Sequence, residues 1–236
     1  MSLPGVHLAP NIQGAPDIYE IENIALDPEG LIEMTMWAIA PWQDRIVVDV
    51  GAGTGYHIPR FHALAAHVIA VEPHDDSRLQ AMARVARLGL PRASVMTGSA
   101  ERLLLPDQSV DILHARFAYF FAPRCAPGLA EVARVMRPGG TAFIIDNDLR
   151  SGTFASWLAR IPGNPNAPAD VVEEFWRDQG FNHERIISQW RFQTRADLEA
   201  VVRLEFGEAL GAELIAEHSG LSVEYHYALY WKTYSA

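Results

Sequence analysis

Cysteine is almost absent from this sequence, because Cys125 is the only one among 236 residues. The chain therefore cannot form an intramolecular disulfide, which fits a reducing compartment. No stretch approaches the roughly 18 consecutive apolar residues of a membrane span, and no charged segment followed by an apolar run suggests a signal peptide. We expect a cytoplasmic protein with no membrane partner, in which Cys125 is a buried thiol rather than a nucleophile.

Basic residues are also few. Lysine and arginine number 19 against 29 aspartates and glutamates, which gives a formal net charge of −10. Proteins that bind duplex nucleic acid usually carry a basic face, since neutralising phosphates supplies most of their affinity. The charge balance and the lack of any Lys/Arg run predict that nucleic acid is not a partner.

Apolar residues, in contrast, are plentiful. Hydrophobic residues make up 49% of the chain and charged residues 20%, a balance that buries a sizeable core and differs from that of disordered chains. The length fits one α/β domain rather than two full domains. We expect a single domain with an N-terminal arm over 1–44, a core over 45–150, an insertion over 151–184 and a final segment over 185–236.

Between residues 45 and 146, short β-branched runs alternate with helical patterns. The runs are nearly all apolar, which is typical of strands buried on both faces of a parallel sheet. The sequence predicts a doubly wound α/β sheet, whose ligands lie beyond the carboxyl ends of the strands. The expected strands span 45–50, 67–72, 93–97, 110–114 and 141–146, and the expected helices span 55–65, 76–88 and 127–136.

The segments outside this core are less regular. Residues 17–40 predict helical pieces broken at Asp27-Pro28, and residues 151–183 predict an insertion with helical parts. Residues 194–219 predict a long helix that begins at a Thr194 cap and stops at Gly220. Strands expected over 185–192 and 221–231 flank this helix and are expected to form an antiparallel edge of the sheet.

Three glycines follow the first predicted strand, at Gly51, Gly53 and Gly55. Glycine lets the backbone turn sharply and approach a ligand closely, and the next helix offers free N–H groups. Glu72 lies 21 residues after Gly51, at the end of the second predicted strand, where a carboxylate can accept hydrogen bonds from ribose hydroxyls. The alternative is a tight turn and an unrelated surface glutamate.

The glycine spacing also separates two classes of cofactor. Dinucleotide sites use G-x-G-x-x-G, in which the third glycine permits close packing over a pyrophosphate. Here the third glycine comes one position early, at Gly55, and Tyr56 stands where glycine or alanine is needed. A ligand without a pyrophosphate fits this pattern better than NAD does.

The run Val47-Val-Asp49-Val-Gly51-Ala52-Gly53-Thr-Gly55 resembles the first motif of the class I S-adenosylmethionine-dependent methyltransferases. The likeness covers about residues 45–146, in particular to the small-molecule branch that includes quinone-biosynthesis C-methyltransferases. It implies a mostly parallel seven-stranded sheet, S-adenosylmethionine as cofactor and S-adenosylhomocysteine as product. It also implies which residues hold the cofactor: Asp49, Gly51, Ala52, Gly53 and Gly55 at the methionine end, Glu72 at the ribose and Pro73 on the adenine side.

Further motifs of that family follow in order. Gly98-Ser99-Ala100-Glu101 stands where the family usually has Gly-Asp-Ala-Glu. The resemblance assigns Ser99, Ala100 and Glu101 to the adenine pocket, where the hydroxyl of Ser99 replaces a charge-assisted hydrogen bond by a weaker neutral one. The run from Pro106 to Leu113 matches the fourth strand, and the run from Leu129 to Gly140 matches the helix and turn before the fifth.

The residues after the fourth strand, from His114 to Phe121, pass beside the methyl donor in that family. His114 is the candidate general base, because its ordinary pKa is near neutrality. Tyr119 is a candidate wall of the acceptor site or cation–π partner of the sulfonium. The alternatives are a structural histidine and a core aromatic cluster. Arg116 is assigned to the cofactor site, with an acidic acceptor or a rim salt bridge as alternative partners.

Three other segments complete the expected site. Asp146-Asn147 resembles a pair in catechol-type O-methyltransferases, but His114-Ala115-Arg116 offers no acid after the fourth strand, so we expect no metal. Tyr19 and Trp37 lie in the arm that is expected to close over the cofactor. The insertion is a candidate acceptor lid, packing extension or homodimer contact, and its aromatic residues are Trp157, Phe175, Trp176 and Phe181.

Three functions remain open from the sequence. The first is transfer of a methyl group to a small, partly apolar acceptor by in-line displacement, in which the protein aligns the reactants and excludes water. The second is a non-catalytic or regulatory S-adenosylmethionine-binding protein. The third is an NAD-dependent oxidoreductase, against which Tyr56 argues.

Overall fold

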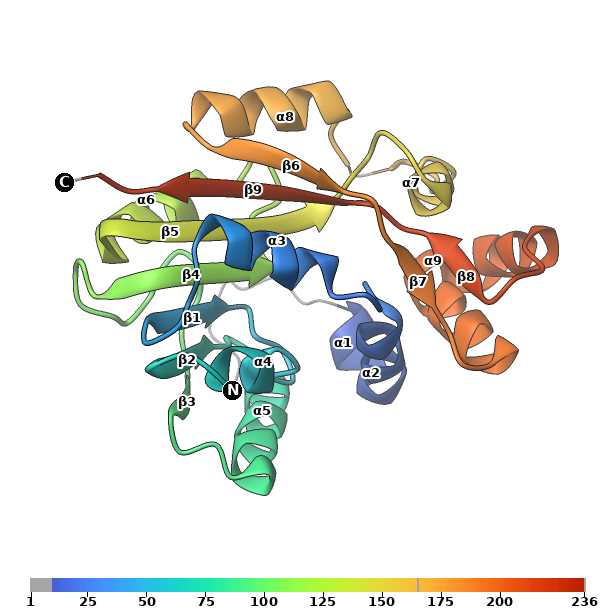
Figure 1. Cartoon of the computed structure of the whole chain (residues 1–236). Coiled ribbons are helices and arrows are strands. Elements are labelled where there is room, and N and C mark those ends of the chain that lie inside the picture. Colours follow the sequence, from blue (N-terminus) through green and yellow to red (C-terminus); the bar gives the residue numbers. More distant parts are fainter. Residues whose placement is uncertain (1–9, 165, 236) are drawn as a thin grey trace.

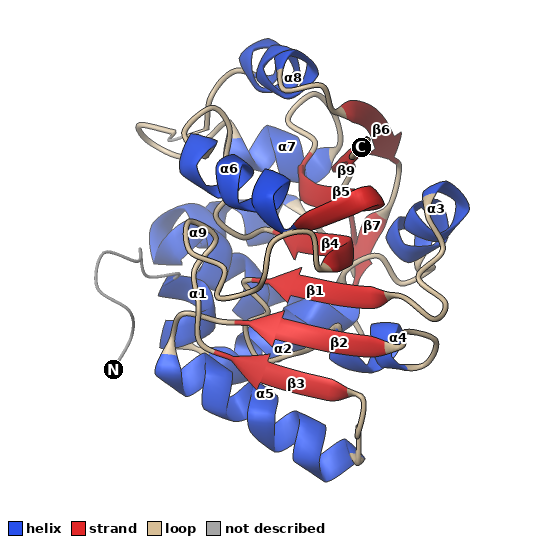
Figure 2. Ribbon diagram, turned by 90° about the vertical axis from the view of Figure 1, so that its left-hand side faces the viewer, coloured by secondary structure: helices blue, strands red, loops and turns tan. Residues whose placement is uncertain are grey.

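The computed structural model describes residues 10–164 and 166–235, and its main feature is a seven-stranded sheet (Figure 1). The first five strands in the order β3-β2-β1-β4-β5-β9-β6 pair in parallel, and Figure 2 shows β1, β2 and β3 pointing the same way. The doubly wound fold is therefore confirmed. The strands are β1 (Ile46–Val50), β2 (His67–Val71), β3 (Ala93–Met96), β4 (Val110–Arg116), β5 (Met136–Asn147), β6 (Asn182–Ile186) and β9 (Tyr227–Thr233).

Helices cover both faces of the sheet, because the central strands are apolar on both sides. Val47 and Phe143 pack in one core layer, and Val48 and Ile144 pack in the other. Figure 2 shows α3 and α4 on one side of the sheet and α6 on the other. The first layer includes residues of α3 (Leu31–Ile39), α4 (Ile58–His62) and α5 (Asp75–Leu88), and the second includes residues of α6 (Ala126–Val135) and α8 (Ala169–Asp178).

Four helices lie toward the carboxyl ends of the parallel strands, the side on which such folds bind ligands. In Figure 1, α1, α2 and α9 lie beyond the ends of β1 and β4. Helix α2 packs against α9, which has a kink at Gly207. The four helices are α1 (Pro10–Gly14), α2 (Pro16–Ala25), α7 (Thr153–Leu158) and α9 (Arg195–Glu217).

The two strands predicted over 185–192 and 221–231 are each broken in two. The first comprises β6 and β7 (Gln189–Arg191), and the second comprises β8 (Ser222–Glu224) and β9. Strands β7 and β8 form a separate two-stranded sheet. The break is stabilised at Ser188, whose carbonyl accepts the Tyr225 N–H at 3.1 Å and whose hydroxyl bonds Asp27. The expected antiparallel strand is β9, which lies one position in from the edge strand β6.

Other boundaries also differ from the predicted ones. Strand β5 begins at Met136, so Pro138-Gly139-Gly140 lies inside the strand rather than before it. Tyr234 explains the extension, because its N–H and carbonyl pair with Gly140 and Gly139 beyond the end of β9. The helix predicted over 55–65 is only α4, which is five residues long, because glycine-rich turns occupy the segment before it.

The insertion is anchored by its aromatic residues. Trp176 is buried and stacks on Tyr230 of β9, with Phe181 packed against it. Trp157 packs against Phe206 of α9. This burial favours the packing alternative for α8, and an acceptor lid formed by the insertion stays a prediction.

Asp27 joins the N-terminal arm to the second sheet. It is 2% exposed, and its carboxylate accepts the N–H of Ile32 and the hydroxyl of Ser188. Replacing it by alanine leaves both donors without that acceptor, so we expect Asp27→Ala to lower the free energy of unfolding by about 3 kcal/mol. Its φ of 45° suits Asp and Asn better than other residues, so Asp27→Asn is the milder control in a denaturant titration. Equal stabilities of the wild type and Asp27→Ala would contradict this.

Candidate functional site

The glycine turn and Glu72 lie side by side at the carboxyl edge of the sheet. Val50 of β1 pairs with Val71 of β2, so the residues that follow the two strands are neighbours. The Glu72 carboxylate accepts the N–H of Gly53 at 2.8 Å and that of His74 at 2.9 Å. Glu72 is 4% exposed, and burial raises its pKa. These contacts fix the carboxylate beside the turn, and they leave further lone pairs for hydroxyl donors.

The backbone of the turn depends on glycine at each of the three positions. Gly51, Gly53 and Gly55 have φ values of 70°, 55° and 76°, a region that other residues rarely adopt. A Cβ at Gly51 would lie 2.4 Å from the Cβ of Ala118, and one at Gly53 would lie 2.7 Å from Cδ1 of Ile12. The turn is thus packed between the segment after β4 and the N-terminal arm, with Ala52 largely buried within it.

Asp49 and His114 form a buried pair on neighbouring strands. They are paired in the register of β1 and β4, and His114 Nδ1 lies 2.8 Å from Asp49 Oδ1. His114 is 1% exposed, and its ring packs against Phe61 and His57. This position favours the structural alternative for His114, and its role as general base stays a prediction. Asp49 Oδ2 is buried with no hydrogen-bond partner among the described residues.

The turn after β3 adjoins Glu72 on the other side. The Glu72 N–H donates to the Met96 carbonyl at 3.1 Å, and a Cβ at Gly98 would meet Val71. Ser99 and Arg102 bond each other through their backbones, which closes a tight turn with Ala100 buried and Glu101 exposed. Ser99, Ala100 and Pro73 therefore lie at the same edge as Glu72.

Two aromatic residues after β4 have an unusual backbone. Phe117 and Tyr119 have φ values of 50° and 53°, and such non-glycine outliers cluster at functional sites. The Tyr119 ring packs against Gly128 at the start of α6 and interacts with Glu101. Arg116 ends β4 with its guanidinium over the rings of Phe117 and Tyr227.

The N-terminal arm covers the glycine turn. Glu20 of α2 accepts a hydrogen bond from Thr54 of the turn and pairs with Arg84 of α5 at 2.6 Å. The preceding residue, Tyr19, interacts electrostatically with Arg116, so it lies near the end of β4. Trp37 instead packs on Trp42 at the face of the sheet, away from the turn. The structure thus brings Tyr19 to the site but not Trp37.

Comparison with known proteins agrees with this geometry. Residues 47–140 match the methyltransferase domain family. An uncharacterised methyltransferase of Mycobacterium tuberculosis is 37% identical over 133 residues, which are 55% of this chain and 51% of that protein. A ubiquinone/menaquinone biosynthesis C-methyltransferase of Rubrivivax gelatinosus is 35% identical over 119 residues, or 50% of this chain and 44% of that protein. This chain spans about half the length of these curated relatives.

A solved structure shows the same fold. The solved structure of the YcgJ protein of Bacillus subtilis superposes with a TM-score of 0.63 at 19% identity, covering 86% of this chain and 97% of its own. The family match, the relatives and the fold together support a class I S-adenosylmethionine-dependent methyltransferase. The residues present fit S-adenosylmethionine, the cofactor that the family implies. Asp49 Oδ2 is buried without a hydrogen-bond donor among the described residues. A ligand can approach the backbone of the turn closely because glycine has no side chain.

Two polar side chains at the end of β5 have partners within the protein. Asp148 is paired with Arg185, and Asn147 accepts a hydrogen bond from the Tyr225 hydroxyl, so these side chains have different partners. Among residues 10–164 and 166–235, no cluster of three or more His, Cys, Asp or Glu residues is arranged to hold a metal ion. Burial also raises the pKa of the Cys125 thiol to about 11, which opposes a nucleophilic role for it.

Asp146 predicts a pH dependence of stability. Burial raises its pKa to about 7, so between pH ~4 and ~7 the folded protein keeps a proton that the unfolded chain has lost, and stability falls as pH rises. We expect Asp146→Asn to gain about 2 kcal/mol relative to the wild type between pH 5 and 8, less than the full shift implies because Asp146 is partly exposed. Denaturant titrations at the two pH values measure this. Asp178→Asn, at an exposed position, should gain nothing, and parallel curves for Asp146→Asn and the wild type would contradict the prediction.

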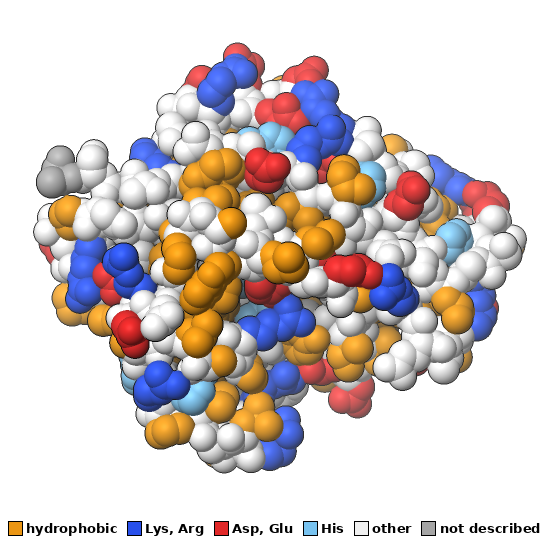
Figure 3. Space-filling view, viewed as in Figure 1, with side chains coloured by type: hydrophobic (Ala, Val, Ile, Leu, Met, Phe, Trp, Pro, Cys, Tyr) orange, Lys and Arg blue, Asp and Glu red, His pale blue; other side chains and the backbone are white. Residues whose placement is uncertain are grey.

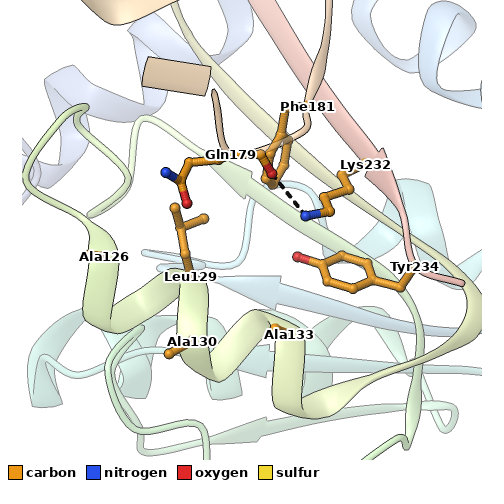
Figure 4. A pocket seen from close by; sticks show the side chains of 8 residues that line it. All are labelled: Ala126, Leu129, Ala130, Ala133, Gln179, Phe181, Lys232 and Tyr234. Atoms are coloured by element: carbon orange, nitrogen blue, oxygen red, sulfur yellow. Dashed lines mark hydrogen bonds between the residues drawn. The ribbon is translucent and has the colours of Figure 1, made fainter. Parts of the chain in front are cut away.

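Two surface features lie apart from the site. A pocket of about 300 Å³ between α6 and β9 is crossed by a hydrogen bond from Lys232 to the Gln179 carbonyl (Figure 4). Lys232 pairs with Ala142 near the middle of β5. On the face drawn in Figure 3, basic side chains are interspersed with acidic ones. None of the described helices is long and apolar enough to cross a membrane.

Sequence reasoning missed a buried polar group above the end of β4. Glu22 of α2 and Glu205 of α9 share a hydrogen bond, and Asn11 of α1 donates to Glu205 at 2.9 Å. Tyr225, between β8 and β9, interacts with both glutamates. No motif marks these residues, since they come from four separate elements. Only the apolar surroundings of Glu22 in its helix hinted at burial.

Proposed function

We propose that this methyltransferase binds S-adenosylmethionine at the glycine turn and transfers its methyl group to a small-molecule acceptor. One observation carries the proposal: the Glu72 carboxylate lies 2.8 Å from the Gly53 N–H, at the carboxyl edge where such folds bind their ligands. Glu72 would accept the ribose hydroxyls, Asp49 and the turn would hold the methionine end, and the turn at Ser99 would flank the adenine.

The bound cofactor supplies a methyl group on an already activated sulfonium. The chain's own task is therefore to orient the reactants and exclude water. Glu20 and Ile12 hold the arm over the turn, which shields the methionine side. The strained segment from Phe117 to Tyr119 lies against Gly51 through Ala118, and it would form the wall between cofactor and acceptor.

A panel of small acceptors, scored for release of S-adenosylhomocysteine, tests the transfer. We expect release with at least one class among amines, phenols, carboxylates and activated carbons. If the protein binds S-adenosylmethionine but releases no product with any class, the non-catalytic function is favoured instead. The acceptors named for the relatives do not identify the acceptor of this protein, because enzymes with the same fold act on many different substrates.

A further inference from the structure

The Glu22–Glu205 pair is an unusual arrangement for the interior of a protein. Glu22 is 5% exposed, and burial together with Glu205 raises its pKa well above the usual range. Burial likewise raises the pKa of Glu205. Glu205 itself is half-buried. Two adjacent carboxylates withdrawn from water in this way do not both ionise unless a cation lies close to them. The pair therefore either holds a proton or binds a positive group.

The formal charges around the pair sum to one uncompensated negative charge. Arg116 is the basic group that interacts with Glu22, but it also lies 3.5 Å from Glu33, which Arg60 contacts at 2.5 Å. With all of them ionised, three carboxylates face two guanidinium groups, so one negative charge remains. His57 does not supply the missing charge, since burial and Arg116 hold its pKa well below the usual range.

Two buried polar atoms also lack partners among the described residues. Glu22 Oε2 receives no N–H or O–H donor, and Arg116 Nε has no acceptor. Arg116 is itself only 9% exposed. Buried polar groups are almost always hydrogen-bonded, so a donor belongs at Glu22 and an acceptor at Arg116. The orphaned Glu22 oxygen points to a donor ligand beside the pair, and Arg116 Nε calls for a separate acceptor.

The pair also lies toward the carboxyl ends of β4 and β5. Its neighbours are Arg116 at the end of β4 and Tyr225, whose hydroxyl bonds Asn147 at the end of β5. The glycine turn and Glu72 instead follow β1 and β2. Because the strand order is β2-β1-β4-β5, the pair lies beside the proposed cofactor site rather than over the ribose.

We propose that the methyl acceptor is a small primary or secondary amine, whose ammonium group binds between Glu22 and Glu205. This inference rests on the proposed function. The ammonium passes one proton to the ionised pair, which returns the pair to its singly protonated form. The freed nitrogen lone pair then forms the new N–C bond as the C–S bond of the sulfonium breaks, with that bond's electron pair remaining on sulfur. The methylated amine leaves as an ammonium ion.

Calorimetry on the protein saturated with S-adenosylhomocysteine tests the proposal. The probes are primary amines from ethylamine to 2-phenylethylamine, each beside the alcohol with the same carbon skeleton. We expect at least one amine to bind tenfold or more tightly than its alcohol. Glu22→Gln and Glu205→Gln should reduce this preference to within twofold, while Glu213→Gln, at an exposed position of the same helix α9, should retain it. Thermal unfolding of each variant verifies that it folds.

The outcomes separate this inference from the proposed function. If the wild type does not bind S-adenosylhomocysteine, the proposed function itself is wrong. If it binds but prefers no amine over its alcohol, or if both glutamine variants keep the preference, the amine assignment is overturned. An equal loss of S-adenosylhomocysteine and amine affinity in Glu22→Gln would also overturn it, by assigning the pair to the methionine end of the cofactor.

Discussion

Replacing Glu72 by alanine is expected to lower the affinity for S-adenosylhomocysteine about 100-fold. A carboxylate that accepts both ribose hydroxyls makes two hydrogen bonds to a charged group, together worth ~3 kcal/mol or more, and every 1.4 kcal/mol is about tenfold in affinity. The same change removes the acceptor of the Gly53 and His74 N–H groups, which loosens the turn. Both effects act in the same direction, and calorimetry measures their sum.

Glu131→Ala is the matched control for this change. Glu131 also accepts a backbone N–H, that of Leu103 at 2.8 Å, and it pairs with Arg134. Its loss removes a similar set of contacts away from the glycine turn, so we expect lower stability but unchanged affinity. Comparable affinity losses in the two variants would mean that Glu72 acts through general stability rather than at the ligand.

Gly51→Ala is expected to abolish detectable cofactor binding and to destabilise the fold by about 3 kcal/mol. The added Cβ would lie 2.4 Å from the Cβ of Ala118, at a φ of 70°. The backbone must therefore shift, and it shifts in the segment that would contact the cofactor. The strain and the clash each contribute about 1–3 kcal/mol.

Gly89→Ala separates these two contributions. Gly89 ends α5 with a φ of 59°, but a Cβ there meets nothing within 4 Å. This variant should cost about 1 kcal/mol and leave S-adenosylhomocysteine binding unchanged. Thermal unfolding and calorimetry on both variants measure the difference. Normal binding by Gly51→Ala would show that the turn does not touch the ligand.

The neighbourhood of the glycine turn and Glu72 was predictable from sequence because its signals are local. Gly51, Gly53 and Gly55 follow one buried strand, and Glu72 ends the next. Two consecutive strands of this type pair in parallel and bring their ends together. The structure bears out that neighbourhood through the 2.8 Å contact between Gly53 and Glu72.

The Glu22–Glu205 pair, which we propose binds the acceptor, was not predictable, because its residues come from distant elements. Glu22 and Glu205 are 183 positions apart in the chain, and only the packing of α2 against α9 joins them. The aromatic residues of the insertion gave a signal, but hydrophobicity alone does not distinguish a lid from a packed helix such as α8. Likewise, the break at Ser188 depends on its tertiary bond with Asp27, which no local pattern encodes.

Calorimetry of the wild-type protein with S-adenosylmethionine, S-adenosylhomocysteine and NAD tests the central claim most directly. We predict micromolar binding of the first two ligands and none of NAD, because Tyr56 stands where a pyrophosphate site needs glycine or alanine. Binding of NAD, or no binding of either adenosyl ligand, would contradict the account.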